Sequence, residues 1–339
     1  MSHNKYDFIA ASLIPTGIGA SIGGFAGDAS PYINLLSKVC PVMVNPNAVN
    51  AAIFSGVNEN VLYTEGWAVD AFFRGDIALR PSKFNKIGVL FDVAIPQKVL
   101  NVHFNTINAV KSVYGMDIMG HEITDEPVGV EFFIAESGIS TGRINNPDTL
   151  ISATNRLIER GAEAIAIVCY FDTPENDDDY AKNGGVDPVG GVEAMISHLV
   201  TEKCLVPAAH APAFSENELL ISAEIVDKRA AAEYITPTFL PCLFYGLYNA
   251  PKLIRREHAL LPDITVEQVG ALIMPYDCLD SPPVYSALER GIPVLAVEEN
   301  RTVLDATPEK LNISDKVIIV KNYQEAAGWV LALKNGICL

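Results

Sequence analysis

Short apolar runs alternate with longer amphipathic stretches along most of this chain, a pattern typical of parallel β-strands joined by helices. The apolar runs predict strands at Phe8–Ile14, Val42–Asn45, Lys86–Phe91, Gly129–Ile134, Ala164–Cys169, Cys204–Ala208, Gly270–Met274, Pro293–Val297 and Lys316–Val320. The amphipathic stretches predict helices at Pro31–Val39, Pro96–Tyr114, Asp148–Arg160, Gly190–Thr201, Pro283–Arg290 and Tyr323–Lys334. We therefore expect an α/β fold with mostly parallel sheets and flanking helices.

The length of 339 residues exceeds the size at which a single hydrophobic core stops growing, so we expect two lobes with a cleft between them. The polar segment Gly120–Val128 is the best candidate for the boundary. This divides the chain into an N-terminal lobe of residues 1–125 and a C-terminal lobe of residues 126–339.

Composition narrows the class of protein. The net charge is −17 and there is no run of Lys or Arg, which argues against nucleic acid as a partner. No stretch of 18 uncharged apolar residues is present, which argues against a membrane span. The six cysteines include no CxxC pair and are typical of reduced thiols, so we expect a cytoplasmic protein. We expect its partner to be a small molecule. A homodimer is the default expectation for its assembly.

A glycine-rich segment follows the first predicted strand. Five glycines occur within eleven residues, and glycine lets the backbone approach a ligand closely and present N–H groups to an anion. The predicted substrate-binding residues of this segment are Thr16, Gly17, Gly19, Ser21, Gly23, Gly24 and Asp28. Asn45 and Asn47, after the second predicted strand, are added to them. The alternative is a packing turn, with Asp28 capping the helix near Pro31.

The same segment argues against a classical NAD(P) site. Its glycine spacing is a variant of the dinucleotide-binding motif, which requires an acidic residue, or a basic one for NADP, after the second strand. Asn45-Pro46-Asn47 stands there instead. The cofactor therefore remains undetermined.

A second predicted anion site lies in the stretch from Glu136 to Asp148, between a strand and a helix. Its hydroxyls, exposed backbone and guanidinium suit a carboxylate or a phosphate, and the residues are Ser137, Gly138, Ser140, Thr141 and Arg143. Helix capping and a solvated arginine are the alternative. Asn300, in a polar cluster after a further strand, is also predicted to bind substrate or to tie two loops together.

The candidate catalytic residues are Cys169, Cys278, His210 and Asp187. Each cysteine ends a predicted strand, and two thiols on opposite sides of a carbon acid can exchange its proton. His210 is the best general acid or base among the six histidines, whereas buried inert thiols are the alternative for the cysteines. Asp187, His198 and His210 together are candidate ligands of a divalent metal, although no HxH or HExxH spacing supports one.

Two resemblances to known families follow from these motifs. Residues 164–172, Ala-Ile-Ala-Ile-Val-Cys-Tyr-Phe-Asp, are locally similar to the strand-cysteine segments of the aspartate/glutamate and hydantoin racemase superfamily. A further set of blocks covers nearly the whole chain: Ile14–Asp28, Asn45–Asn47, Tyr63–Trp67, Gly184–Pro188, Ala209–Pro212 and Glu298–Asn300. By these blocks the chain resembles the DUF3326 family. It implies a shared compact fold with a site near these blocks, and no reaction.

The leading functional hypothesis is an enzyme that moves a proton on a small polar, carboxylate-bearing metabolite, as an isomerase, racemase or lyase. One alternative is a metal- or cysteine-dependent hydrolase of a cyclic amide or lactone. The other is a metabolite-binding protein without catalytic activity.

Overall fold

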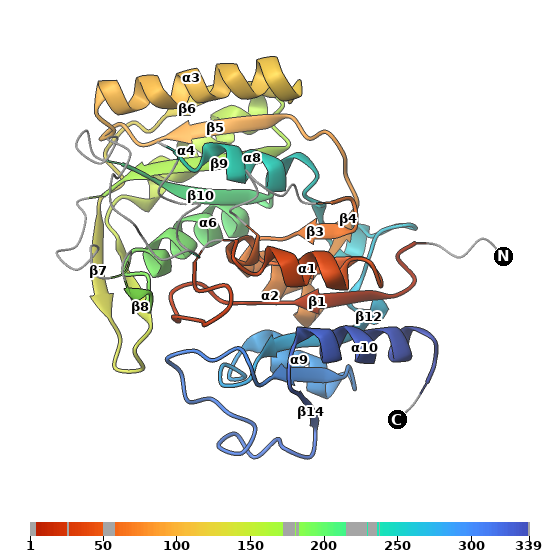
Figure 1. The fold of residues 1–339 in the computed structure, drawn as a ribbon. Helices are drawn as coiled ribbons and strands as arrows, with labels where there is room; N and C mark the ends of the chain where they lie inside the picture. The colour runs from red at the N-terminus through yellow and green to blue at the C-terminus, as the bar shows by residue number, and fades with distance from the viewer. Residues whose placement is uncertain are drawn as a thin grey trace.

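The computed structural model describes residues 5–25, 27–49, 58–171, 180, 183–214, 229, 236 and 238–337. Its two largest sheets are both parallel, which confirms the predicted α/β class. Figure 1 shows them as two layers, with helices around and between them.

The larger sheet, sheet A, has six parallel strands in the order β14-β13-β12-β1-β2-β3. Its strands are β1 (Ile9–Ser12), β2 (Val42–Val44), β3 (Val61–Tyr63), β12 (Val269–Pro275), β13 (Val294–Val297) and β14 (Val317–Val320). Most of their residues are fully buried, as continuous apolar strands in a parallel sheet should be.

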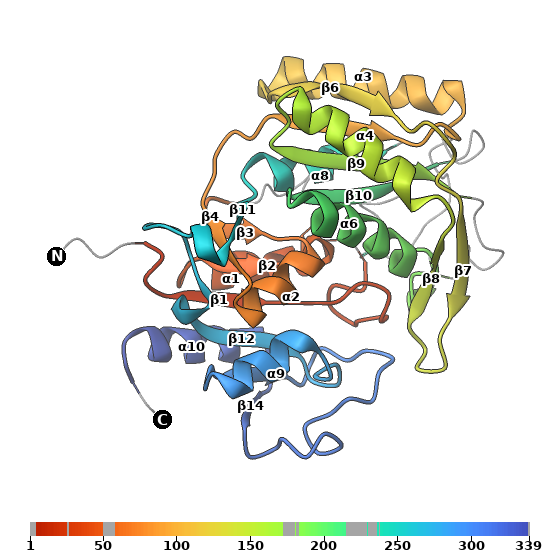
Figure 2. The ribbon, with the colours of Figure 1, turned by 180° about the vertical axis from the view of Figure 1, so that it is seen from behind.

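Helices cover both faces of sheet A. Helices α1 (Ser30–Leu36) and α10 (Tyr323–Lys334) pack together on one face, and α2 (Gly66–Arg74) and α9 (Pro282–Glu289) pack together on the other (Figures 1 and 2). Strand β2, which follows β1 in the sequence, lies on one side of β1 in the sheet. Strand β13, which follows β12, lies on the opposite side, beyond β12. The strand order therefore reverses between β1 and β12, and ligands bind at such points in open parallel sheets.

The second sheet, sheet C, has four parallel strands in the order β10-β9-β5-β6. They are β5 (Ile87–Phe91), β6 (Ile118–Ile123), β9 (Ala164–Tyr170) and β10 (Ala208–Ala213). The helices packed on it or on each other are α3 (Gln97–Tyr114), α4 (Pro147–Glu159), α6 (Gly190–Cys204) and α8 (Leu240–Tyr248). Helix α6 also contacts α2, so it connects the two layers.

Two small antiparallel pairs complete the strands of the described residues. One is the hairpin of β7 (Val130–Ile134) and β8 (Ser140–Ile144), which extends along one side of the molecule in Figure 1. The other joins β4 (Ile77–Arg80) to β11 (Lys252–Arg255). Three short 3₁₀ helices are η1 (Pro46–Ala48), η2 (Arg256–His258) and η3 (Val266–Gln268).

Two of the predicted strands differ from the structure. The strand predicted at Cys204–Ala208 is wrong, because α6 continues through Cys204 and Leu205 ends it in a left-handed conformation. The strand β10 begins only at Ala208, after Pro207. The segment predicted at Gly129–Ile134 is a strand, but it lies in the exposed β7–β8 hairpin and not in a parallel sheet.

The predicted division at residues 125 and 126 does not coincide with the division between the sheets. Sheet A combines strands from the two ends of the chain, and sheet C takes its strands from the middle. Residue 125 lies between β6 and β7, so it comes after the strands β5 and β6 of sheet C and before the other two strands of that sheet.

Candidate functional site

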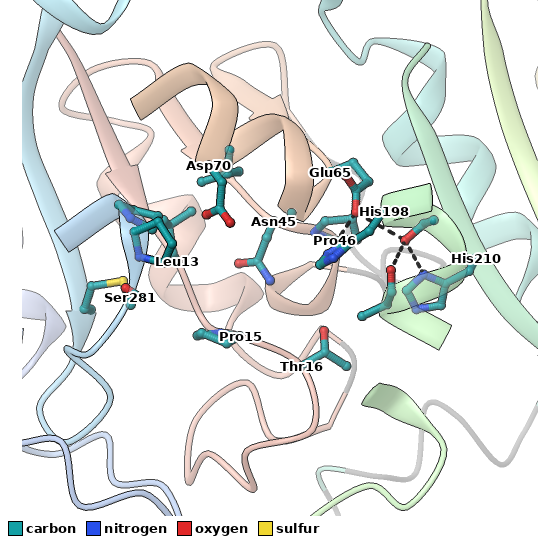
Figure 3. Close-up of a pocket in the computed structure, with 17 residues that line it drawn as sticks. Leu13, Pro15, Thr16, Asn45, Pro46, Glu65, Asp70, His198, His210 and Ser281 are labelled. Carbon is teal, nitrogen blue, oxygen red and sulfur yellow. Dashed lines mark hydrogen bonds and ion pairs between the residues drawn. The ribbon is translucent and has the colours of Figure 1, made fainter. Parts of the chain in front are cut away.

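A cavity of about 260 Å³ opens between the carboxyl ends of the sheet A strands and the elements α6 and β10 (Figure 3). Segments that follow β1, β2, β3 and β12 form one side, and the N-terminal half of α6 with β10 forms the other. Its described lining is Leu13, Pro15, Thr16, Asn45, Pro46, Glu65, Gly66, Val69, Asp70, Ala194, Ser197, His198, His210, Met274, Ser281, Pro282 and Pro283. The cavity thus lies at the reversal of strand order.

Glu65 is the best-buried charged group of this lining, with 3% of the residue exposed. It is the N-cap of α2, and its Oε2 accepts hydrogen bonds from the backbone N–H groups of Trp67 at 2.7 Å and Ala68 at 3.4 Å. A carboxylate suits this position, because it satisfies the free N–H groups at a helix start. Burial nevertheless dominates and raises the pKa of Glu65 to about 8.

The other oxygen of Glu65 belongs to a chain of hydrogen-bonding groups. Its Oε1 lies 3.1 Å from His198 Nε2 and accepts a hydrogen bond from Ser197 Oγ at 3.3 Å. Ser197 Oγ is also 2.8 Å from His210 Nδ1. Dashed lines in Figure 3 mark these contacts on one wall of the cavity. Two imidazoles are therefore connected through a carboxyl and a hydroxyl.

Burial also changes the titration of the two histidines. It lowers the pKa of His210 to about 3, with a further contribution from His198, and it lowers the pKa of His198. Both imidazoles are neutral at pH 7, and a neutral imidazole is a base. Glu193 Oε2 lies 3.9 Å from His210 Nε2 on the side away from Ser197.

Gly66 allows His198 to approach Glu65. A Cβ atom on Gly66 would lie 2.4 Å from His198 Nε2, well inside van der Waals contact. Because His198 is half-exposed, a larger residue at position 66 would displace its ring instead of disrupting the core. The glycine at this position therefore fixes the geometry of the histidine.

The glycine-rich segment folds back on the body of the protein, and of its predicted residues only Thr16 lines the cavity. Gly17, Gly19 and Gly23 do adopt positive φ, as expected for a glycine turn. Gly24 allows a close approach within the segment, since a Cβ there would lie 1.9 Å from the carbonyl oxygen of Ala20. The predicted role as the wall of the site is thus limited to its first residues.

Asn300, which is fully buried, ties this segment to sheet A. Its Oδ1 accepts a hydrogen bond from Ile22 N at 3.0 Å, and its Nδ2 donates to Ile22 O and to Tyr323 Oη, both at 2.9 Å. Ser21 Oγ bonds the backbone of residue 299 and contacts Asn300 Oδ1 at 3.3 Å. These groups hold two loops together, which is the second of the predicted roles for Asn300.

The remaining polar residues of the segment also make internal bonds. Asp28 Oδ1 accepts a hydrogen bond from Gly23 N, and Asn47 Nδ2 donates to the carbonyl oxygens of Ile14 and Gly23. Asn45 lines the cavity, but its side chain accepts from Ile14 N at 2.9 Å and donates to Ile14 O at 2.7 Å. These bonds position the edges of the cavity.

The local structure at residues 137–143 differs from the expected one, and the binding of an anion there stays a prediction. Ser140, Thr141 and Arg143 lie in β8, so the segment is a hairpin and does not run from a strand into a helix. Ser140 Oγ donates to Pro188 O at 2.8 Å, Thr141 Oγ1 contacts Met195 Sδ at 3.9 Å, and Arg143 is exposed. None of the five predicted residues, Ser137, Gly138, Ser140, Thr141 and Arg143, is in the described lining of the cavity.

The two predicted catalytic thiols are not brought together. Cys169 is buried in the core around sheet C, Cys278 is buried in the core around sheet A, and burial raises the pKa of both thiols. Neither lines the cavity described above. Asp187 accepts a hydrogen bond from Val189 N at 3.0 Å, so its side chain stabilises the turn that leads into α6.

Within the part of the chain that the structure describes, no group of three or more His, Cys, Asp or Glu side chains is arranged as potential metal ligands. Asp187, His198 and His210 therefore do not form the metal set considered from the sequence. Among the same residues, no helix is both long and apolar enough to cross a membrane.

His210 was the one catalytic candidate that lies in the cavity, and Glu65 and Ser197 were missed. A usable signal existed for Glu65, since Thr64-Glu65-Gly66 follows the apolar run of β3 at a place where a polar residue starts a helix. Ser197 gave no such signal, because its neighbours in the site come from α2 and β10, far away in the sequence.

Comparison with known proteins places this chain in a family. A relative from Synechococcus sp., described as an uncharacterized lipoprotein, is 38% identical over 331 residues, which are 96% of this chain and 90% of the relative. The prediction of a cytoplasmic location is wrong by this comparison, because that relative is described as a lipoprotein. The shorter likeness to the racemase superfamily stays a prediction.

A solved structure, a periplasmic ribose ABC transporter from Conexibacter woesei, is 12% identical and covers 61% of this chain and 90% of that chain. Its TM-score of 0.19 is too low to indicate a shared fold. The family model described as "Protein of unknown function (DUF3326)" matches residues 10–339. The chain therefore belongs to the DUF3326 family, as its sequence blocks indicated.

Proposed function

We propose that the cavity is the active site of an enzyme that transfers a proton on a small substrate, in the isomerase, racemase or lyase class. The observation that carries this proposal is the chain His198–Glu65–Ser197–His210, whose successive contacts are 3.1, 3.3 and 2.8 Å. General acid–base catalysis needs a base and an acid within reach of one substrate.

The protonation states suit such a transfer. Neutral histidines accept a proton, and Glu65, which keeps its proton up to about pH 8, supplies one. The hydroxyl of Ser197 links the carboxyl to the second imidazole, so a proton taken up on one side can be replaced from the other. Burial thus keeps Glu65 protonated and both histidines unprotonated near neutral pH, which provides one proton donor and two acceptors.

The carboxylate-bearing substrate that we expected from the sequence is not part of this proposal. None of the described lining residues is Lys or Arg, and Asp70, whose pKa of about 6 leaves it ionised at pH 7, disfavours a second anion. Apolar side chains such as Leu13, Val69 and Met274 make up much of the rest. We infer a substrate with an apolar body and no net negative charge.

Hydrogen exchange at carbon tests the proposal directly. The protein is incubated in D₂O with a panel of small ketones, lactams and amines, and deuterium in each compound is measured by mass spectrometry. We expect the wild-type protein to label at least one compound, and His198→Gln to lower the rate by a factor on the order of 100. Gly66→Ala should lower it too, because the new methyl group displaces the His198 ring.

His258→Gln is the matched control for this experiment, since His258 is exposed and lies in η2, outside the described lining. Its exchange rate should equal that of the wild type. Labelling that survives unchanged in both His198→Gln and Gly66→Ala would contradict the proposed role of His198.

The pH dependence of the same exchange reaction gives an independent prediction. Activity should fall as the pH rises through about 8, because Glu65 then loses the proton that it donates. It should persist below pH 6.5, because burial lowers the pKa of both histidines and so keeps them unprotonated and able to accept a proton. A rate that increases steadily between pH 7 and pH 9 would rule out Glu65 as the acid.

A second candidate function gives Ser197 and His210 other roles and adds Glu193. Ser197 Oγ, His210 and Glu193 are arranged in the order nucleophile, base and carboxylate, at 2.8 and 3.9 Å. This favours a serine hydrolase over the metal- or cysteine-dependent forms considered from the sequence. Covalent labelling of Ser197 by a fluorophosphonate, detected by peptide mass spectrometry, distinguishes hydrolysis from proton transfer.

A further inference from the structure

Asp70 is the second carboxyl group of the cavity and stands apart from the hydrogen-bonded chain. It lies on α2 four residues after Gly66, on the same side of the helix, and both residues line the cavity. With a rise of 1.5 Å per residue, the two positions are roughly 6 Å apart along the helix axis. Figure 3 shows its carboxylate directed toward the middle of the cavity, between Leu13 and Asn45.

No hydrogen bond or ion pair connects Asp70 to another residue of the described part of the chain. The nearest basic residue on α2 is Arg74, one turn further on, and its guanidinium bonds Asp76 Oδ2 at 2.8 Å. Partial burial raises the pKa of Asp70 to about 6, with Arg74 opposing the shift, so the group is ionised at pH 7. Among the described residues, the cavity therefore contains one carboxylate that forms no ion pair with a Lys or Arg.

The surroundings of Asp70 favour a positive ligand. A carboxylate beside Leu13, Val69 and Met274 loses part of its hydration, and an opposite charge compensates this loss. None of the described lining residues supplies that charge. The net charge of −17 over the whole protein also attracts cations to its surface.

We propose that Asp70 binds a cationic nitrogen of the substrate, an ammonium or amidinium group on an apolar body. The apolar body fills the space lined by Leu13, Val69 and Met274, and the reacting carbon lies about one helical turn from the nitrogen, near His198. This inference rests on the proposed function and names the class of substrate for it.

Thermal shift with three probes of equal chain length tests the inference. The probes are n-pentylammonium, 1-pentanol and pentanoate, each titrated at pH 7.5 against the whole protein. We expect n-pentylammonium to stabilise the protein most, and Asp70→Asn to weaken its binding by a factor of about 10 to 100, as for a charge-assisted hydrogen bond. Asp117→Asn is the matched control and should bind as the wild type, because Asp117 is exposed and lies outside the described lining.

Three results would overturn the inference: pentanoate binding as tightly as n-pentylammonium, unchanged binding in Asp70→Asn, or a shift caused by Mg²⁺ alone that Asp70→Asn removes. Removing a partly desolvated charge should not unfold the protein, so the melting temperature without ligand shows that the variant is intact. Asp70-dependent binding of amines without deuterium exchange in any of them would refute the proposed function and leave the inference standing. Deuterium exchange in uncharged compounds that is unchanged in Asp70→Asn would support the proposed function and refute the inference about Asp70.

Discussion

Replacing Glu65 by glutamine is expected to lower proton transfer by a factor of 100 or more and, at the same time, to stabilise the fold at pH 7. The loss of activity follows because an amide cannot donate and recover a proton as a carboxyl group does. Glutamine keeps the shape and the hydrogen bonds. Its oxygen can accept from Trp67 N, and its amide nitrogen can donate to Ser197 Oγ and His198 Nε2.

The gain in stability follows from proton linkage. The pKa of Glu65 is about 8 in the folded protein and 4.5 in an unperturbed state, so the folded form holds a proton that the unfolded form releases between these values. Stability is therefore fully present below pH 4.5 and decreases as the pH rises to about 8, by about 1.4 kcal/mol per pH unit. Glutamine removes this cost, which is on the order of 3 kcal/mol at pH 7.

Urea denaturation of both proteins at pH 4.5, 7 and 8.5 measures the effect. The free energies of unfolding should agree at pH 4.5 and diverge in favour of Glu65→Gln at the higher values. Glu59→Gln is the control, because Glu59 is exposed and its variant should not become more stable. Equal pH dependence of Glu65→Gln and the wild type would show that the carboxyl is ionised in the folded protein.

Most strands of the two parallel sheets and most helices could be predicted because their signal is local, whereas β6 and β10 were not predicted as strands. The helix Tyr323–Lys334 has the predicted bounds, and α4 and α9 each end just before a glycine, Gly161 and Gly291, with positive φ. The strand β3 and the helix α2 were missed, since the run Val61–Tyr63 is only three residues long and follows a polar stretch. Because α2 was not predicted, Glu65 was not expected at the start of a helix.

The site was harder to predict, because its residues come from elements that meet only in the folded chain. Glycines, hydroxyls and amides after strands were interpreted as ligand-binding groups, and several of the polar side chains among them bond backbone groups of neighbouring loops. Asn47 and Asn300 show this directly, as both bond main-chain atoms of the glycine-rich segment. Composition cannot distinguish a polar residue that binds a ligand from one that holds a loop, whereas burial and bonding partners do.

Asn300→Ala is expected to lower the free energy of unfolding by about 3 to 5 kcal/mol, and this loss does not depend on a bound ligand. Alanine would leave Ile22 N, Ile22 O and Tyr323 Oη without their hydrogen bonds in a buried region, and each such group costs about 1 to 3 kcal/mol. Urea denaturation at pH 7 measures the loss. Asn101→Ala is the control, because Asn101 is exposed on α3 and its removal should change stability by less than about 0.5 kcal/mol.

Tyr323→Phe separates the two interpretations of Asn300. It removes only the hydroxyl that accepts from Asn300 Nδ2 at 2.9 Å, so it should cost about 1 kcal/mol. Because the two residues share this bond, the double variant should be less destabilised than the sum of the single variants. If Asn300 bound substrate instead, Asn300→Ala would weaken ligand binding while its free energy of unfolding stayed close to that of the wild type. The complete burial of Asn300 and its four internal hydrogen bonds argue for the first result, in which the residue fixes the segment that carries Thr16 to the edge of the cavity.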